Sequence, residues 1–163
     1  MKKLSSLLLL LALSICWSYA QQAKYVFYFI GDGMGVNQVQ GTEIYRAELE
    51  GKMGITPLLF TQFPYSTVAI TNSATNRVTD SAAAGTALAT GRKTKNSAIG
   101  VLKDQETPIN SVAVWAKNKG CRVGIATSVT VNHATPGAFY AHAAKRTLYH
   151  EIGKAVSYTH LTL

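Results

Sequence analysis

The sequence predicts an α/β fold, a doubly wound and largely parallel sheet with helices on both faces. Short apolar segments rich in aromatic and β-branched residues alternate with segments of helical periodicity, which is typical of parallel strand–helix units. The first unit reads as a strand, a glycine-rich turn and a helix in succession. No internal repeat, low-complexity region or linker interrupts the pattern, so we expect one domain.

The amino-terminal half begins with a strand–turn–helix unit. An apolar run at 24–30 predicts a buried strand, and the glycines within 31–35 break it. Apolar residues at roughly helical spacing predict a helix over 36–50. Residues 51–64 are loop-like, and 66–71 alternate in polarity as a strand does.

The second helix is the most clearly bounded one. Residues 72–79 form a polar lead-in, Asp80 is the expected N-cap, and an alanine-rich stretch then favours a helix that ends near Gly91. The lysines, glycine and proline within 92–108 predict an exposed, solvated loop.

A third helix and a third strand follow. Asn110 or Ser111 caps a predicted helix that runs through Lys119, with Gly120 as its stop signal. Residues 121–128 are apolar and β-branched and predict another strand.

The last predicted helix begins at Thr135. Thr135 before Pro136 has the arrangement of an N-cap followed by proline at the first helical position, so we expect a helix running towards Arg146 and beyond. Residues 156–163 do not continue the helical pattern, and we expect them to be a truncation or an artefact. The domain is therefore predicted to span 21–155.

The start of the chain predicts a signal peptide at 1–20. Lys2 and Lys3 precede an apolar run at 4–15, which is too short for a membrane span, and Ser18-Tyr19-Ala20 is a small-x-small cleavage site. We expect export to the periplasm or the exterior and no membrane span after cleavage. A lipoprotein anchored at Cys16 is the alternative, which the bulky residue before that cysteine disfavours.

The chain is basic, with a net charge of +8 that falls by two when the signal peptide is removed. Its lysines are scattered without a dense tract or aromatic interleaving, so they indicate a solvated surface, and we expect no nucleic-acid binding. A general cationic binding protein is the weakest functional alternative. Cys121 is the only cysteine beyond the signal peptide, so it has no internal disulfide partner, and a buried strand thiol is the expectation.

Asp32 lies between glycines directly after the first predicted strand. A dinucleotide-binding turn also has glycines there, but the spacing is Gly-x-Gly-x-Gly, and a carboxylate inside the turn would repel a pyrophosphate. Two interpretations remain open from the residues alone. Asp32 either shapes the turn or binds a cation such as magnesium or zinc.

Ser81 stands at the expected start of the alanine-rich helix. Free N–H groups and the dipole at a helix N-terminus favour an anion and would stabilise an ionised hydroxyl. A serine nucleophile also needs a base or a metal. No Gly-x-Ser-x-Gly elbow is present, although His133, His142 and His150 leave a catalytic triad open. The simpler interpretation is a capped core helix in which Ser81 has no chemical role.

These candidate residues follow the ends of successive predicted strands. Asp32 follows the first strand, Ser81 the second, and His133 and Thr135 the third. Sites in open α/β sheets form beyond the carboxyl ends of the strands. We therefore expect the candidates to meet at one edge of the sheet.

Three separated motifs together resemble the alkaline phosphatase family. They are Phe-Tyr-Phe-Ile-Gly-Asp-Gly-Met-Gly at 27–35, Asp80-Ser81, and His-Ala-Thr-Pro-Gly-Ala-Phe-Tyr-Ala-His-Ala-Ala-Lys-Arg at 133–146. The resemblance runs in matching order from about residue 24 to about residue 154 and corresponds to the amino-terminal part of such an enzyme. The Cys/Ser-x-Pro-x-Arg motif of sulfatases is absent, which disfavours that related branch.

The resemblance implies a role for each candidate. Ser81 would be the nucleophile that forms a phosphoseryl enzyme, and Arg146 would bind the phosphate. Asp32 would bridge a zinc and a magnesium, Ser81 would bind zinc, Thr135 would bind magnesium, and His133 would tune the magnesium through water. Two zincs and one magnesium would then serve the hydrolysis of phosphate monoesters in a secreted or periplasmic enzyme, a homodimer when full length.

The sequence departs from the family in the ligands it supplies. After Arg146 only His150, Glu151 and His160 remain, and they cannot hold both zincs. We therefore expect this chain to be an inactive fragment with an incomplete sheet. The alternative function from the residues alone is a non-catalytic anion- or nucleotide-binding α/β module, in which Ser81 only caps its helix.

Overall fold

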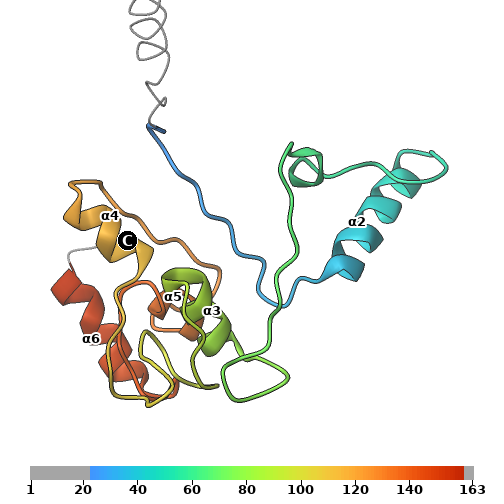
Figure 1. Ribbon diagram of the computed structural model, residues 1–163. Coiled ribbons are helices and arrows are strands. Elements are labelled where there is room, and N and C mark those ends of the chain that lie inside the picture. The colour runs from blue at the N-terminus through green and yellow to red at the C-terminus, as the bar shows by residue number, and fades with distance from the viewer. Residues whose placement is uncertain (1–22, 160–163) are drawn as a thin grey trace, which may run out of the picture. The chain divides into compact units, whose positions relative to one another are not determined.

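The computed structural model describes residues 23–159 (Figure 1). These residues fall into two units, 23–31 and 32–159. In the first unit the chain is extended, and Phe27 and Phe29 stack with ring centroids 6.4 Å apart. Both rings are largely exposed, so the buried strand predicted at 24–30 is not formed here. The predicted signal peptide, 1–20, lies outside the described residues.

The predicted helix over 36–50 is confirmed as α2 (Val36–Leu49). The backbone N–H of Gly35 donates to Gln38 Oε1 at 3.0 Å, which satisfies one of the amides that a helix start leaves without a partner. On the same helix the buried Glu43 carboxylate accepts from Leu58 N at 2.9 Å and from Thr61 Oγ1 at 2.6 Å. Glu43 therefore attaches the following loop and its short helix η1 (Phe60–Gln62) to α2.

The second predicted helix is confirmed as α3 (Ser81–Thr90). Asp80 caps it as expected, since its Oδ1 accepts from Ala83 N at 2.9 Å. Gly91 ends the helix with a left-handed φ of 71°, a conformation that glycine adopts without a steric cost.

The third predicted helix is confirmed as α4 (Val112–Asn118), and Ser111 rather than Asn110 is its cap. The Ser111 Oγ accepts from Val114 N at 3.3 Å and donates to Phe139 O at 2.6 Å, so the cap also ties α4 to the chain after α5.

The predicted sheet is not formed within residues 23–159, where the structure has isolated β-bridges in place of strands. Residues 66–71 form neither helix nor strand, residues 121–128 contain one isolated bridge residue at Gly124, and Val68 remains 93% exposed. A strand is stabilised by the backbone of a neighbouring strand, which these segments do not provide for one another. Cys121, predicted to be buried on a strand, is exposed for the same reason.

The single helix predicted from Thr135 towards Arg146 is wrong. Helix α5 (Ala134–Gly137) is short, and its N-cap is His133, so Thr135 lies inside it. The chain then leaves the helical path because Ile99 and Ala143 exchange both backbone hydrogen bonds, at 2.9 and 2.8 Å. These long-range bonds replace the helical ones.

A separate helix, α6 (Tyr149–Thr159), follows. It continues through the first residues of the segment 156–163, where the helical pattern was expected to have ended, while 160–163 lie outside the described residues. None of the helices within 23–159 combines the length and the apolar character that crossing a membrane requires.

The core of the second unit forms where α3 packs against α5 (Figure 1). A Cβ atom added at Gly85 of α3 would lie 3.3 Å from Ala138 Cβ and 3.4 Å from Thr135 Cα, so the absence of a side chain permits this close approach. Small residues dominate the buried cluster, with Ile99 and Ile152 as its largest fully buried side chains. The buried cluster consists of Ala82, Ala89, Ile99, Ala134, Ala138, Tyr140, Ala141, Ala143 and Ile152.

Candidate active site

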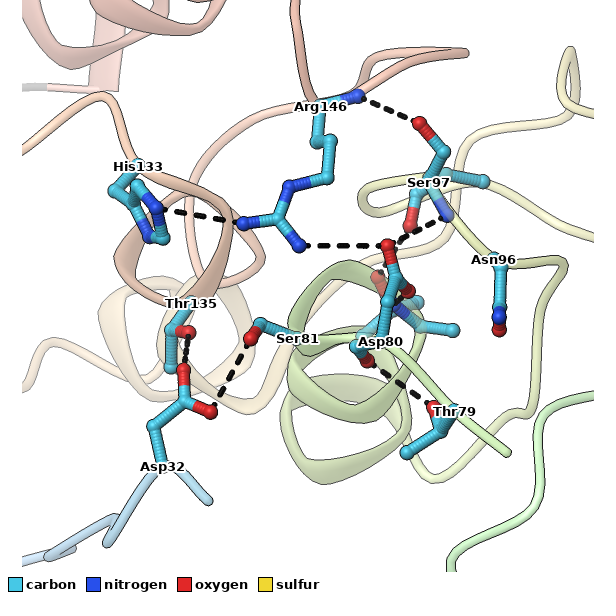
Figure 2. A network of polar contacts seen from close by, with 12 residues as sticks. Asp32, Thr79, Asp80, Ser81, Asn96, Ser97, His133, Thr135 and Arg146 are labelled. Atoms are coloured by element: carbon cyan, nitrogen blue, oxygen red, sulfur yellow. Dashed lines mark hydrogen bonds and ion pairs between the residues drawn. The ribbon is translucent and has the colours of Figure 1, made fainter.

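Three of the predicted site residues meet at the Asp32 carboxylate (Figure 2). Ser81 Oγ donates to Asp32 Oδ1 at 3.1 Å, and Thr135 Oγ1 donates to Asp32 Oδ2 at 2.8 Å. These contacts join residues that are 49 and 103 positions apart in the sequence. The packing of α3 on α5 brings the two hydroxyls close together, and the Asp32 carboxylate accepts a hydrogen bond from each.

Ser81 is the first residue of α3, and Asp80 supplies the cap in its place. The Ser81 hydroxyl is therefore directed at Asp32 and not at the backbone of its own helix. The interpretation in which Ser81 only caps the helix is wrong for this structure. A hydroxyl at the positive end of a helix, beside a carboxylate, has the surroundings of a candidate nucleophile.

Arg146 approaches the same place from the segment before α6. Figure 2 shows its guanidinium between His133 and Asp80, with the Ser81 hydroxyl nearby. Nη1 lies 3.4 Å from Asp80 Oδ2, and Nη2 lies 3.4 Å from His133 Nε2. Arg146 was predicted to lie on the helix that begins at Thr135, but that helix ends at Gly137. The position of Arg146 is instead fixed by its backbone N–H, which donates to Ser97 O at 2.7 Å.

His133 sits at the N-cap of α5, two residues before Thr135. Its Nδ1 is buried and has no hydrogen-bond partner among residues 23–159. The Arg146 guanidinium that contacts the other ring nitrogen can only donate, so in a neutral ring Nδ1 carries the proton and calls for an acceptor such as a water. His142 lies elsewhere, with its Nδ1 2.6 Å from Gly100 O, and does not serve as a base for Ser81.

Sequence reasoning missed the contribution of the loop after α3. Residues 92–108 were predicted to be a solvated connector, but Ala98, Ile99 and Val101 are at most 3% exposed, so that interpretation is wrong for its centre. Ser97 donates its backbone N–H to Asp80 Oδ2 at 2.9 Å, so the Asp80 carboxylate holds both the helix start and this loop. The apolar run Ala-Ile-Gly-Val at 98–101 is a signal that could have indicated burial.

The donors at the site fit part of a metal centre. A carboxylate flanked by two hydroxyls is an oxygen set of the kind that magnesium prefers. A zinc site requires three or four protein ligands, and within residues 23–159 no three side chains of His, Cys, Asp or Glu gather closely enough to hold a metal ion. The described residues therefore supply some of the oxygen ligands of a magnesium-type site and do not complete a zinc site.

The sequence and the fold of the chain are similar to those of known proteins. The family model described as alkaline phosphatase matches residues 23–160. The tissue-nonspecific alkaline phosphatase of Gallus gallus is 39% identical over 139 residues, which cover 78% of this chain and 26% of that protein. The chain thus spans about a quarter of the length of that curated relative.

Two solved structures extend the similarity to three dimensions. The cold-active alkaline phosphatase of a psychrophilic Shewanella species has a TM-score of 0.73 and 34% identity, covering 81% of this chain and 33% of that one. A variant alkaline phosphatase of the Antarctic bacterium TAB5, with Mg bound in its M3 site, has a TM-score of 0.63 and 35% identity, covering 74% and 34%. These enzymes have an α/β fold, in agreement with the predicted class. The chain belongs to the alkaline phosphatase family.

Proposed function

We propose that this chain carries the nucleophile and the phosphate-binding arginine of an enzyme that hydrolyses phosphate monoesters. The observation that carries the proposal is the convergence of Ser81 and Thr135 on Asp32, with the Arg146 guanidinium beside them. A non-catalytic anion-binding module would need the Arg146 guanidinium and the helix N-terminus alone. The contact between the Ser81 hydroxyl and the Asp32 carboxylate would not contribute to anion binding.

In this proposal Ser81 Oγ attacks the phosphorus of the ester, and the alcohol departs as the phosphoseryl bond forms. Water then attacks the phosphoserine, which returns the free hydroxyl and releases inorganic phosphate. Asp32 holds the Ser81 hydroxyl in place before attack. The guanidinium of Arg146 pairs with two phosphate oxygens, and the N-terminus of α3 favours the transferred charge.

The metal ligands are also proposals. Asp32 would bridge a zinc and a magnesium, Ser81 would bind zinc, Thr135 would bind magnesium, and His133 would act on the magnesium through a water. Two zincs and one magnesium, when bound, would lower the pKa of the serine hydroxyl and of the attacking water. The Mg in the TAB5 variant and the oxygen donors around Asp32 support the magnesium part.

Export and assembly remain proposals as well. The signal peptide at 1–20 is expected to direct the protein to the periplasm or the exterior, with cleavage after Ala20. Mass spectrometry of exported protein that still begins at Met1 would contradict this cleavage. A homodimer is expected for a chain of the length of its relatives.

A chimaera tests the proposed reaction. Residues 21–155 replace the matching part of the Shewanella enzyme, and release of phosphate from a chromogenic monoester is measured with added zinc and magnesium. We expect turnover that Ser81→Ala abolishes and that Thr79→Ala preserves, because the Thr79 hydroxyl donates to Asp80 O and not to Asp32. Equal turnover in the Ser81→Ala chimaera would refute the nucleophile and favour the anion-binding module.

A further inference from the structure

Two residues other than glycine have a left-handed backbone within the described chain, Ser97 with φ 76° and Gln105 with φ 67°. This conformation is unfavourable for a residue with a side chain, so neighbouring contacts must compensate for it. Both residues bond to the same short segment, 142–146, which ends at Arg146. Strained residues that converge on one segment often mark a functional constraint.

The main chain of this segment is firmly attached to the loop after α3. Ile99 and Ala143 exchange backbone hydrogen bonds at 2.9 and 2.8 Å, and both side chains are buried. Arg146 N donates to Ser97 O at 2.7 Å. The backbone of the arginine is thus fixed at its own amide and again three residues before it.

Gln105 adds a side-chain attachment between those two points. Its Nε2 donates to Ala144 O at 2.7 Å, while its Oε1 accepts from Lys95 Nζ at 3.0 Å. Both the oxygen and the nitrogen of the Gln105 amide are therefore hydrogen-bonded. Because the Lys95 ammonium can only donate, it must face the amide oxygen, which leaves the amide nitrogen to donate to Ala144 O. The left-handed backbone of Gln105, in a turn closed by its N–H to Leu102 O at 2.9 Å, directs the side chain to this carbonyl.

The guanidinium of Arg146 is held much less closely than its main chain. Its contacts with Asp80 Oδ2 and His133 Nε2 are both 3.4 Å, at the long limit for a hydrogen bond. Contacts of this length are weak, whereas those of the backbone lie between 2.7 and 2.9 Å. The segment therefore fixes the backbone of Arg146 and leaves its guanidinium able to adjust to an anion.

We propose that Gln105 is a positioning residue for phosphate binding, which acts through Arg146. Its bond to Ala144 O holds the segment so that the guanidinium reaches a phosphoryl group at Ser81. The inference rests on the proposed role of Arg146 and adds to it a residue from the loop that the sequence assigned to a solvated connector.

The test measures the affinity of the 163-residue chain for inorganic phosphate by nuclear magnetic resonance titration. Gln105→Met keeps an unbranched side chain of similar length without the amide and without a new charge. We expect about a three- to tenfold weaker affinity, the usual effect of losing one hydrogen bond. Lys103→Gln, an exposed change in the same loop, is the control and should leave the affinity unchanged.

A double-mutant cycle separates positioning from general damage. If Gln105 acts through Arg146, then Gln105→Met has no further effect on phosphate affinity in the Arg146→Ala background. Hydrogen exchange at the Arg146 amide should also become faster in Gln105→Met. If that variant fails to fold, Gln105→Asn, which keeps the amide one methylene short of Ala144 O, takes its place.

The outcomes discriminate between the two proposals. Unchanged phosphate affinity in Gln105→Met, together with loss of binding in Arg146→Ala, would overturn the positioning role and leave the proposed function standing. An equal loss in both backgrounds would also overturn it, because Gln105 would then act independently of the arginine. If Arg146→Ala binds phosphate as the native chain does, the proposed role of Arg146 fails, and the positioning role fails with it.

Discussion

Replacing Asp80 should reveal how much one carboxylate contributes to the site. Its Oδ1 accepts from Ala83 N at 2.9 Å, and its Oδ2 accepts from Ser97 N at 2.9 Å and contacts Arg146 Nη1 at 3.4 Å. The N-cap contributes about 1 kcal/mol. An amide left without its partner at the partly buried Ser97 costs about 1 kcal/mol or more.

The ion pair adds little to this sum. The Asp80 and Arg146 side chains are 24% and 26% exposed, and their contact is long, so the pair contributes less than about 1 kcal/mol. We therefore expect Asp80→Ala to lower the free energy of unfolding by about 2 to 3 kcal/mol. Asp80→Asn keeps one oxygen as the cap, so its loss should be about half as large.

Urea unfolding followed by circular dichroism measures these differences. Glu106→Ala removes an exposed carboxylate and serves as the control, with an expected change within about 0.5 kcal/mol. A loss below about 0.5 kcal/mol in Asp80→Ala would refute the stabilising role of this carboxylate, because the N-cap alone should contribute more. Equal losses in the alanine and asparagine variants would show that the shared oxygen has no capping role.

The remaining predictions concern metal binding and two shifted pKa values. Asp32→Asn removes the negative charge of the carboxylate that Ser81 and Thr135 contact and should weaken Mg²⁺ binding in calorimetry, and unchanged affinity would favour the role of turn former. The hydrogen bond from Thr61, and then that from Leu58, lower the pKa of Glu43, so the attachment of the loop is present above the ordinary glutamate pKa. It should be lost as pH falls through the lowered value, seen as faster exchange of the Leu58 amide, and a pH-independent rate would contradict this. Burial raises the pKa of Tyr140 to about 12, so folding stability should decline as pH rises above 10, where the unfolded phenol ionises. A component of the phenolate absorbance with a midpoint near 10 that is present in the folded native chain and missing in Tyr140→Phe would refute it.

The local signals in the sequence predicted the helix starts well. Asp80 and Ser111 are caps in the structure because a short side-chain oxygen can reach the amide three residues on, whatever the distant surroundings are. The predicted meeting of Asp32, Ser81 and Thr135 is confirmed, although α3 and α5 bring them together without the sheet on which the prediction relied.

The features that sequence reasoning missed depend on long-range contacts. Residues 138–146 have a helix-compatible composition, but the buried Ile99–Ala143 pairing outweighs that local preference. The second contact of Asp80, with Ser97, joins residues 17 positions apart and has no local signature. The strands predicted at 66–71 and 121–128 have suitable residues, yet pairing is a property of two segments and cannot be read from one.

The activity of the 163-residue chain by itself is expected to be absent. Asp32, Ser81 and Thr135 hold a divalent cation through few groups, so it would stay weakly bound and largely hydrated. Without a fixed metal the serine keeps the high pKa of an alcohol and is a poor nucleophile. Robust metal-dependent turnover by this chain, lost in Ser81→Ala, would show that further ligands exist among its residues.

The most direct measurement locates the phosphate on the enzyme. The chimaera is mixed with a phosphate monoester, quenched in acid and digested, and the peptide containing residues 79–92 is analysed by mass spectrometry. We expect a phosphoserine at Ser81 in the native chimaera and in Thr79→Ala, and none in Ser81→Ala. Phosphate on another residue, or an unmodified peptide from a chimaera that turns over substrate, would contradict the assignment of Ser81 as the nucleophile.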